Sequence, residues 1–324
     1  MTANTSTKLS ILAAVLAAVL LAVTTARSWA IHKKVFVDTT ARTKSEGKSP
    51  TLRLQSLITR GAQLREQGRY QEAAPVLKEA LSLAEGSFGE NSFEVAVALN
   101  QSGMLGKYDG HFDEAEADYH RALKIAEQTA GLNSEFAATL FHNLGGLEHA
   151  RGRFAAGESY GRRALEIRER LLGPDHVDTA ADVAALAALI DGQGRYEEAE
   201  RLYLRALSIF ERAYGPDSYD VAVNLNNLAA LHQANGRGAE AEAAYLHALR
   251  IKEKLLGPEH PDVAMTLNNL AVFYKSQQRL EEAAGLYRRA LAIFEQTLEP
   301  THPKLVTCRE NYERLLSEMR LAQK

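Results

Sequence analysis

Residues 256–271 read LGPEHPDVAMTLNNLA, a stretch that contains a helix end, a short connection and a helix start. Gly257 can adopt the left-handed conformation that ends a helix, and Pro258 prevents the helix from continuing. Similar stretches recur every 42 residues, without insertion or deletion. The pair Ala-Leu marks the same point of each copy, at Ala80-Leu81, Ala122-Leu123, Ala164-Leu165, Ala206-Leu207, Ala248-Leu249 and Ala290-Leu291. A fixed period of this length predicts a solenoid of helical repeats.

A single copy, residues 221–262, predicts two helices. Val221, Leu225 and Leu228 lie at helical spacing, and Gly236 ends this first helix. A second apolar stripe then continues to Gly257. Because the connection between the two helices is short, we expect them to pack side by side and antiparallel.

The residues of these helices resemble a known repeat. Leu-Asn-Asn-Leu-Ala at 225–229 and 267–271, followed by spaced Ala, Tyr and Ala in the second helix, is similar to the tetratricopeptide repeat. That repeat usually has 34 residues, and the longer period resembles the variant found in kinesin light chains and in many bacterial proteins. The resemblance implies an all-α, right-handed superhelical solenoid of antiparallel helix pairs. It places six units at 53–94, 95–136, 137–178, 179–220, 221–262 and 263–304, with a capping helix at 305–324.

Two departures from the repeat pattern lead to further expectations. The third unit has Gly157 and Gly161 where other units have Ala and Tyr, which predicts weaker packing because glycine destabilises helices and lacks a ring. Glu313 occupies a position that is Gly or Ala in every full unit. This predicts that the last helix turns a polar face to solvent and caps the array.

The N-terminal residues have the pattern of a targeting segment. Lys8 precedes an apolar run from Leu9 to Val23, and small residues follow, which is typical of a secretory signal peptide at residues 1–30. Residues 9–26 also reach the lower length limit of a membrane-spanning helix, so an uncleaved anchor remains the alternative. The sequence favours export, to the periplasm or outside the cell, after cleavage. Residues 31–52 lack periodicity and are predicted to be a linker.

Composition argues against several classes of partner and site. The 38 basic and 41 acidic residues are spread over all units, so there is no basic stripe for nucleic acid. Cys308 is the single cysteine and cannot form an internal disulfide; we expect it to be half-buried in the last helix. No cofactor is implied.

The histidines are interpreted as helix caps. His176, His260 and His302 occupy a repeat position that is serine in the other units: Ser92, Ser134 and Ser218. Acidic residues and prolines follow, as at helix starts. The sequence contains no zinc-protease, serine-hydrolase or nucleotide-binding motif. We therefore predict neither a metal site nor an enzyme.

Amide side chains recur on the first helices. The resemblance implies that they line a concave groove, at Asn100, Gln101, His142, Asn143, Asn226, Asn227, Asn268 and Asn269, with Lys107, His149, Asp191, Gln233 and Lys275 about a turn and a half further on. Asparagine both donates and accepts hydrogen bonds, so such a row can pair with the backbone of an extended peptide. The alternative is that these amides join neighbouring helices or face water. Ala184 and Ala185 interrupt the row.

The sequence thus predicts a non-enzymatic scaffold that binds a peptide segment of a partner protein in its groove. One rival function remains open: a structural subunit of an envelope or membrane-associated complex that assembles through its convex face or its ends. The sequence predicts membrane contact only through the N-terminal segment, and it leaves the oligomeric state open.

Overall fold

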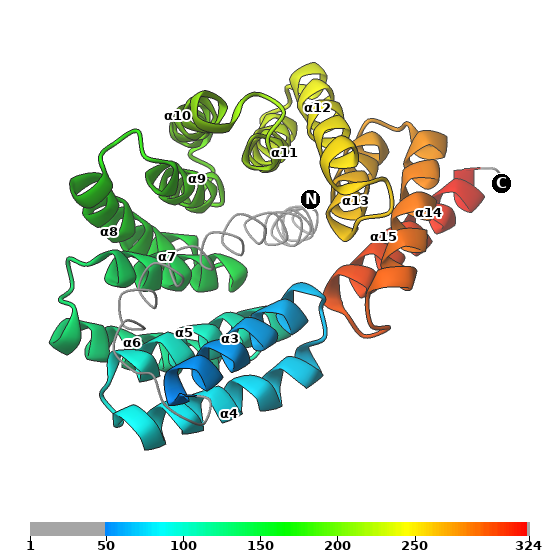
Figure 1. Cartoon of the computed structure of the whole chain (residues 1–324). Helices are drawn as coiled ribbons and strands as arrows, with labels where there is room; N and C mark the ends of the chain where they lie inside the picture. The colour runs from blue at the N-terminus through cyan, green and yellow to red at the C-terminus, as the bar shows by residue number, and fades with distance from the viewer. Residues whose placement is uncertain (1–48, 323–324) are drawn as a thin grey trace. The chain divides into compact units, whose positions relative to one another are not determined.

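The computed structural model describes residues 49–322, and this part of the chain is built from helices joined by short turns (Figure 1). With the labels of Figure 1, the helices are α3 (Pro50–Glu66), α4 (Tyr70–Phe88), α5 (Phe93–Asp109), α6 (Phe112–Thr129), α7 (Glu135–Ala150), α8 (Phe154–Leu172), α9 (Val177–Asp191), α10 (Tyr196–Tyr214), α11 (Tyr219–Ala234), α12 (Gly238–Leu256), α13 (Pro261–Ser276), α14 (Leu280–Thr297) and α15 (Pro303–Ala322). The predicted all-α class is confirmed.

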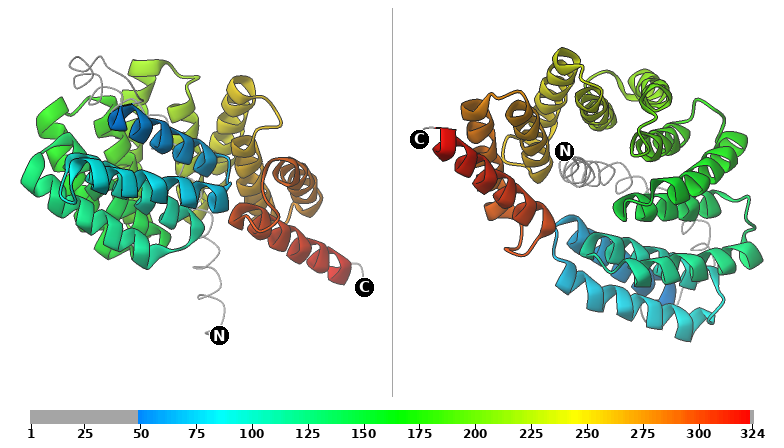
Figure 2. Two further views of the ribbon diagram at one scale, coloured as in Figure 1. Left: turned by 60° about the horizontal axis from the view of Figure 1, so that its bottom comes forward. Right: turned by 180° about the vertical axis from the view of Figure 1, so that it is seen from behind.

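The helices form two compact units, and each unit contains several of the 42-residue repeats. The first unit ends at Leu189, and the second unit begins at Ile190. Within each unit, helix pairs such as α5 with α6 and α11 with α12 pack together, as the views of Figures 1 and 2 agree. The first helices of neighbouring repeats also contact one another: α3 with α5, α5 with α7, and α11 with α13. Within each unit, we call the surface formed by these first helices the first-helix face. The solenoid-like repetition of helix pairs is confirmed.

Capping residues set the helix starts as predicted. The Ser134 hydroxyl accepts a hydrogen bond from the Ala137 backbone N–H at 3.2 Å. His260 Nδ1 accepts one from the Asp262 N–H at 3.1 Å, and His176 and His302 cap their helices in the same way. Each of these histidines is therefore an acceptor at Nδ1, which explains its position at a helix entry. Ser218 differs, because its buried hydroxyl has no such bond within the described residues.

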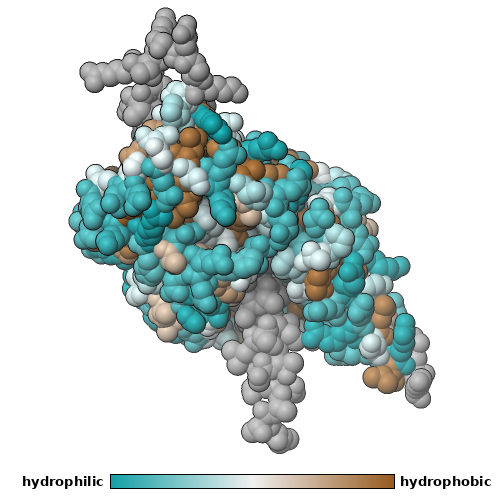
Figure 3. Space-filling view, turned by 90° about the horizontal axis from the view of Figure 1, so that it is seen from below, coloured by the Kyte–Doolittle hydropathy of each residue, from teal (hydrophilic) through white to brown (hydrophobic). Residues whose placement is uncertain are grey.

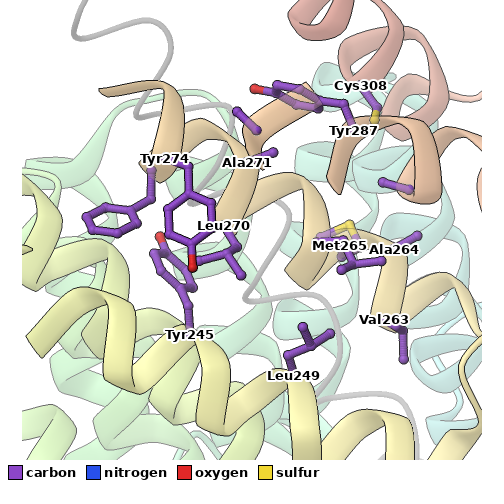
Figure 4. Packing of buried hydrophobic residues seen from close by; sticks show 14 of the residues in the cluster. Tyr245, Leu249, Val263, Ala264, Met265, Leu270, Ala271, Tyr274, Tyr287 and Cys308 are labelled. Atoms are coloured by element: carbon purple, nitrogen blue, oxygen red, sulfur yellow. The ribbon is translucent and has the colours of Figure 1, made fainter. Parts of the chain in front are cut away.

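In four of the six repeats, the core contains an aromatic ring set against a small residue. Tyr119, Tyr203, Tyr245 and Tyr287 of the second helices are fully buried. A Cβ added at Gly103 would lie 2.8 Å from Tyr119 Cε1, so only glycine leaves room for that ring. Figure 4 shows Tyr245 of α12 beside Leu270 of α13. Close packing of this kind fixes how far apart the two helices of a repeat can lie.

The third repeat lacks this tyrosine and fills the space differently. Leu189 of α9 packs against the two glycines of α8. A Cβ added at Gly157 would lie 2.5 Å from Leu189 Cδ2, and one added at Gly161 would lie 3.1 Å from Leu189 Cδ1. The glycines are thus matched to a leucine from the next repeat. The absence of a ring at Gly161 does not leave an empty space there.

The two ends of the described region refine the predicted boundaries. Helix α3 begins at Pro50, inside the segment predicted to be a linker, because proline is well suited to the first turn of a helix. In α15, Glu313 is exposed as expected, while Leu315 is buried against the preceding repeat. Cys308 is fully buried, which corrects the half-buried expectation, and burial raises the pKa of its thiol to about 12.

The predicted signal peptide or anchor at residues 1–30, and the linker up to residue 48, lie outside the described residues. None of the helices in residues 49–322 combines the length and the apolar character that crossing a membrane requires. Hydrophilic residues cover most of the face presented in Figure 3, and hydrophobic ones form small separate groups.

We expect Gly157→Ala to destabilise the protein by about 1–3 kcal/mol, although alanine is the better helix former, because the added methyl meets Leu189 and the Gly145 carbonyl. Gly285→Ala in α14 is the matched control. Its added methyl has no neighbour within 4 Å, so it should stabilise by about 0.5–1 kcal/mol. Urea unfolding of both variants measures the difference, and equal shifts in the two would contradict the matched packing of Leu189.

Candidate functional site

The predicted amide row lies on the first-helix face, and part of it joins neighbouring helices. Asn143 Nδ2 donates to Asn100 Oδ1 at 2.8 Å, between α7 and α5. Asn269 Nδ2 donates to Asn226 Oδ1 at 3.4 Å, between α13 and α11. All four side chains are buried. Each of these two pairs links residues 43 positions apart, one in each of two successive repeats.

In the third and fourth repeats, a charged network replaces the amide pair. The residue 43 positions after His142 is Ala185, which has no amide. His142 instead donates a hydrogen bond from Nδ1 to Asp182 Oδ1 at 2.7 Å. Arg168 Nε donates to the other oxygen of Asp182 at 2.8 Å. Burial alone would raise the pKa of Asp182, but the nearby Arg168 and His142 hold it below its usual value. The ionised carboxylate therefore joins a first helix and a second helix to the next repeat.

Several amide atoms on this face remain without a partner among the described residues. They are Asn100 Nδ2, Asn226 Nδ2, Asn227 Oδ1 and Asn268 Oδ1. Buried polar atoms in folded proteins are almost always hydrogen-bonded, to protein or to another molecule. The described residues therefore leave part of the hydrogen-bonding capacity of these amides unused. Gln101 differs, because its Oε1 accepts from Arg65 Nη1 at 3.0 Å.

A second set of polar residues occupies the last turn of the first helices. We call it the end column; it consists of Arg65, Lys107, His149, Asp191, Gln233 and Lys275, one per repeat. In the first unit the column is basic. The Lys107 ammonium lies 5.3 Å from the centre of the Tyr108 ring, and an added Cβ at Gly146 would lie 3.3 Å from it.

Burial lowers the pKa values of two side chains in the basic part of the end column, Lys107 and His149. It lowers the pKa of Lys107 to about 8, and the charge of Arg65 lowers it further in the same direction. It also lowers the pKa of His149 to about 4, with a smaller effect from Lys107. His149 is therefore neutral at pH 7, and its ring packs edge-on against Phe154 with ring centres 5.2 Å apart.

In the second unit the end column has a different character. Gln233 accepts a hydrogen bond from the Tyr245 hydroxyl at 3.3 Å, and Lys275 forms an ion pair with Glu318 of α15 at 2.8 Å. Asp191 is 4% exposed, and neither carboxylate oxygen has a partner among the described residues. Burial raises the pKa of Asp191 to about 7.

Inter-repeat ion pairs at the helix turns were missed by the sequence interpretation. Arg237 pairs with Glu200, and Arg279 with Glu242, each at 2.7 Å. The sequence does contain a pattern that could have predicted them. From the third repeat onward, an arginine precedes each second helix at intervals of 42 residues. Residues 49–322 contain no group of three or more His, Cys, Asp or Glu side chains placed to hold a metal ion.

The repeated helix pairs and their 42-residue register agree with the comparison to known families. Residues 52–128, 136–212, 181–233, 220–296 and 262–323 match the family model described as the tetratricopeptide repeat. The chain belongs to the tetratricopeptide repeat family. The predicted resemblance is thereby confirmed, and this family is one of protein-interaction scaffolds.

Solved structures share the fold at low sequence identity. BtubC (BKLC) from P. vanneervenii is 23% identical, with 82% of this chain and 92% of that chain covered and a TM-score of 0.51, in line with the predicted kinesin-light-chain type. NprR in complex with its cognate peptide NprX is 13% identical, with coverage of 98% and 89% and a TM-score of 0.62. Aspartyl phosphate phosphatase F from Bacillus subtilis is 14% identical, with coverage of 85% and 70% and a TM-score of 0.54. No curated protein matches the sequence.

We expect Asp191→Asn to stabilise the protein at pH 8 and to have little effect near pH 4. Because the native pKa of about 7 lies above the unfolded value near 4, wild-type stability is fully present below pH 4 and is lost as the pH rises to 7. The three-unit difference corresponds to at most about 4 kcal/mol. Urea unfolding at several pH values measures it, with Glu259→Gln, an exposed carboxylate, as control. A stability difference that does not change with pH would contradict the buried carboxylate.

Proposed function

We propose that this protein binds an extended segment of a partner protein along the first-helix face. The observation that carries the proposal is the set of buried amide atoms without partners beside amides that are paired. In the second unit, Asn226 Nδ2, Asn227 Oδ1 and Asn268 Oδ1 have no hydrogen-bond partner among residues 49–322. A peptide backbone carries both complementary groups at every residue except proline.

The spacing of the repeats suits such a ligand. Packed helices lie about 8–10 Å apart, and an extended chain advances about 3.3 Å per residue. The backbone of every third residue of the segment would thus meet the amides of a successive first helix. Pairing through the backbone leaves the ligand's side chains free, so the amides supply affinity and other residues supply selectivity.

The comparisons support a binding function without defining the ligand. NprR, which shares the fold, forms a complex with its cognate peptide NprX. The amides, ion pairs and buried side chains of the first-helix face suit recognition, and we assign none of them a catalytic role. The predicted groove residues differ in burial: Lys107, His142, Gln233, Asn268 and Lys275 are half-buried, and the others are buried.

A second candidate function, structural assembly, is favoured by one observation. Leu204 of α10 and Leu246 of α12 occupy the same repeat position on adjacent second helices and are 49% and 41% exposed. Exposed leucines at equivalent positions of two second helices suit contact with another protein. Concentration-dependent self-association that is lost in Leu204→Ser/Leu246→Ser would support this function.

We expect Asn227→Ala/Asn268→Ala to weaken ligand binding about 5- to 150-fold, since two hydrogen bonds of roughly 0.5–1.5 kcal/mol each are lost. The fold should be retained, because the removed oxygens have no partner in the part of the chain that the structure describes, and alanine favours helix. The measurement is calorimetric titration of peptides selected from a random phage-displayed library on the wild type. Asn235→Ala, an exposed asparagine after α11, is the control. Unchanged affinity in the double variant would move the binding site away from this face.

We also propose that residues 1–30 direct the chain to a membrane, where they are cleaved to release an exported protein or retained as an anchor formed by residues 9–26. Their sequence pattern supports this proposal. Mass spectrometry of the native protein should find an N-terminus near residue 30, or an intact chain in the membrane fraction. An intact chain in the soluble cytoplasmic fraction would contradict both forms.

A further inference from the structure

Asp191 has the opposite charge from the one its position favours. It is the last residue of α9, and a helix C-terminus carries partial negative charge that favours cations. The other members of the end column follow this rule or are neutral: Arg65, Lys107, His149, Gln233 and Lys275. Among the first helices α3 to α13, only α9 lacks a basic residue in its last turn.

The surroundings of Asp191 in the second unit do not neutralise it. Both carboxylate oxygens are buried without a partner among the described residues, and the same holds for the hydroxyl of Tyr203 on α10. Burial first, and then the charge of the Asp191 carboxylate, raise the pKa of the Tyr203 hydroxyl well above its usual value. Gln233 of α11 is already paired with the Tyr245 hydroxyl. The buried Asp191 carboxylate and the buried Tyr203 phenol thus have no cationic partner among residues 49–322.

We propose that Asp191 and Tyr203 receive the guanidinium group of an arginine side chain from the segment bound on the first-helix face. Two carboxylate oxygens match the planar, forked donors of arginine, and the phenol oxygen accepts a further N–H. The incoming cation supplies the charge that the end of α9 lacks. Gly192 and Gly194, which follow Asp191, have no side chains to cover the end of the helix.

This inference rests on the proposed function for the origin of the arginine, but its test does not need the partner. The probe is L-argininamide, with L-citrullinamide as its uncharged counterpart of the same shape, titrated into the full chain at pH 8 and followed by calorimetry. Wild type should bind argininamide at least about 10-fold more tightly than citrullinamide, as expected for hydrogen bonds between charged groups.

Three variants test the assignment. Asp191→Asn keeps the shape and removes the charge, so it should abolish the preference for argininamide. Tyr203→Phe should reduce it only a few-fold, and Glu259→Gln, an exposed carboxylate, should leave it unchanged. Circular dichroism confirms that each variant is folded, and Asp191→Glu, which keeps the charge, should retain the preference if Asp191→Asn fails to fold.

Equal binding of the two probes by the wild type would overturn the inference and identify Asp191 as a protonated internal acid only. The same conclusion follows if Asp191→Asn retains the full preference. Neither result bears on the proposed backbone contacts of Asn227 and Asn268, so the proposed function is tested separately from the arginine site.

Discussion

The close approach of each first helix to its own second helix is the constraint on which the rest of the structure depends. It requires a residue without a large side chain on one helix and a side chain that fills the remaining space, as Gly103 and the Tyr119 ring show. Once this distance is fixed, the first helices of successive repeats come into contact, and side chains 43 residues apart can bond. The amide pairs and the charged network of Asp182 follow from this geometry.

Much of this arrangement could be predicted from the sequence because it depends on local rules. Helix ends at Gly257, helix entries at Ser134 and His260, and the small residues opposite the rings all follow from residue type and spacing. Gly157 and Gly161 could not be interpreted in the same way. Their packing is completed by Leu189, and nothing within the third repeat itself indicates which residue of the next repeat fills the space.

The role of the amide row was harder to predict for a related reason. Asn226 and Asn227 are adjacent and chemically identical, yet one is joined to Asn269 and the other retains a free oxygen. The paired amides lie 43 positions apart, and at that distance before Asn227 the sequence has Ala184, which offers no amide. Aligning the six copies would also have singled out Asp191 as the one acid in its column. Its burial and lack of a partner among the described residues, however, required the structure.

The ion pair between Arg279 and Glu242 spans 37 residues, and the amide pair of Asn269 and Asn226 spans 43. Contacts of this kind join a repeat only to its neighbour, so the cost of closing a long loop of chain is never paid. Folding can then begin at any well-packed pair and extend in either direction. By the same reasoning, a gene that gained or lost a whole 42-residue unit would still encode complete interfaces, because every contact would find its partner in the next copy. The length of the array could therefore change during evolution without the invention of a new core.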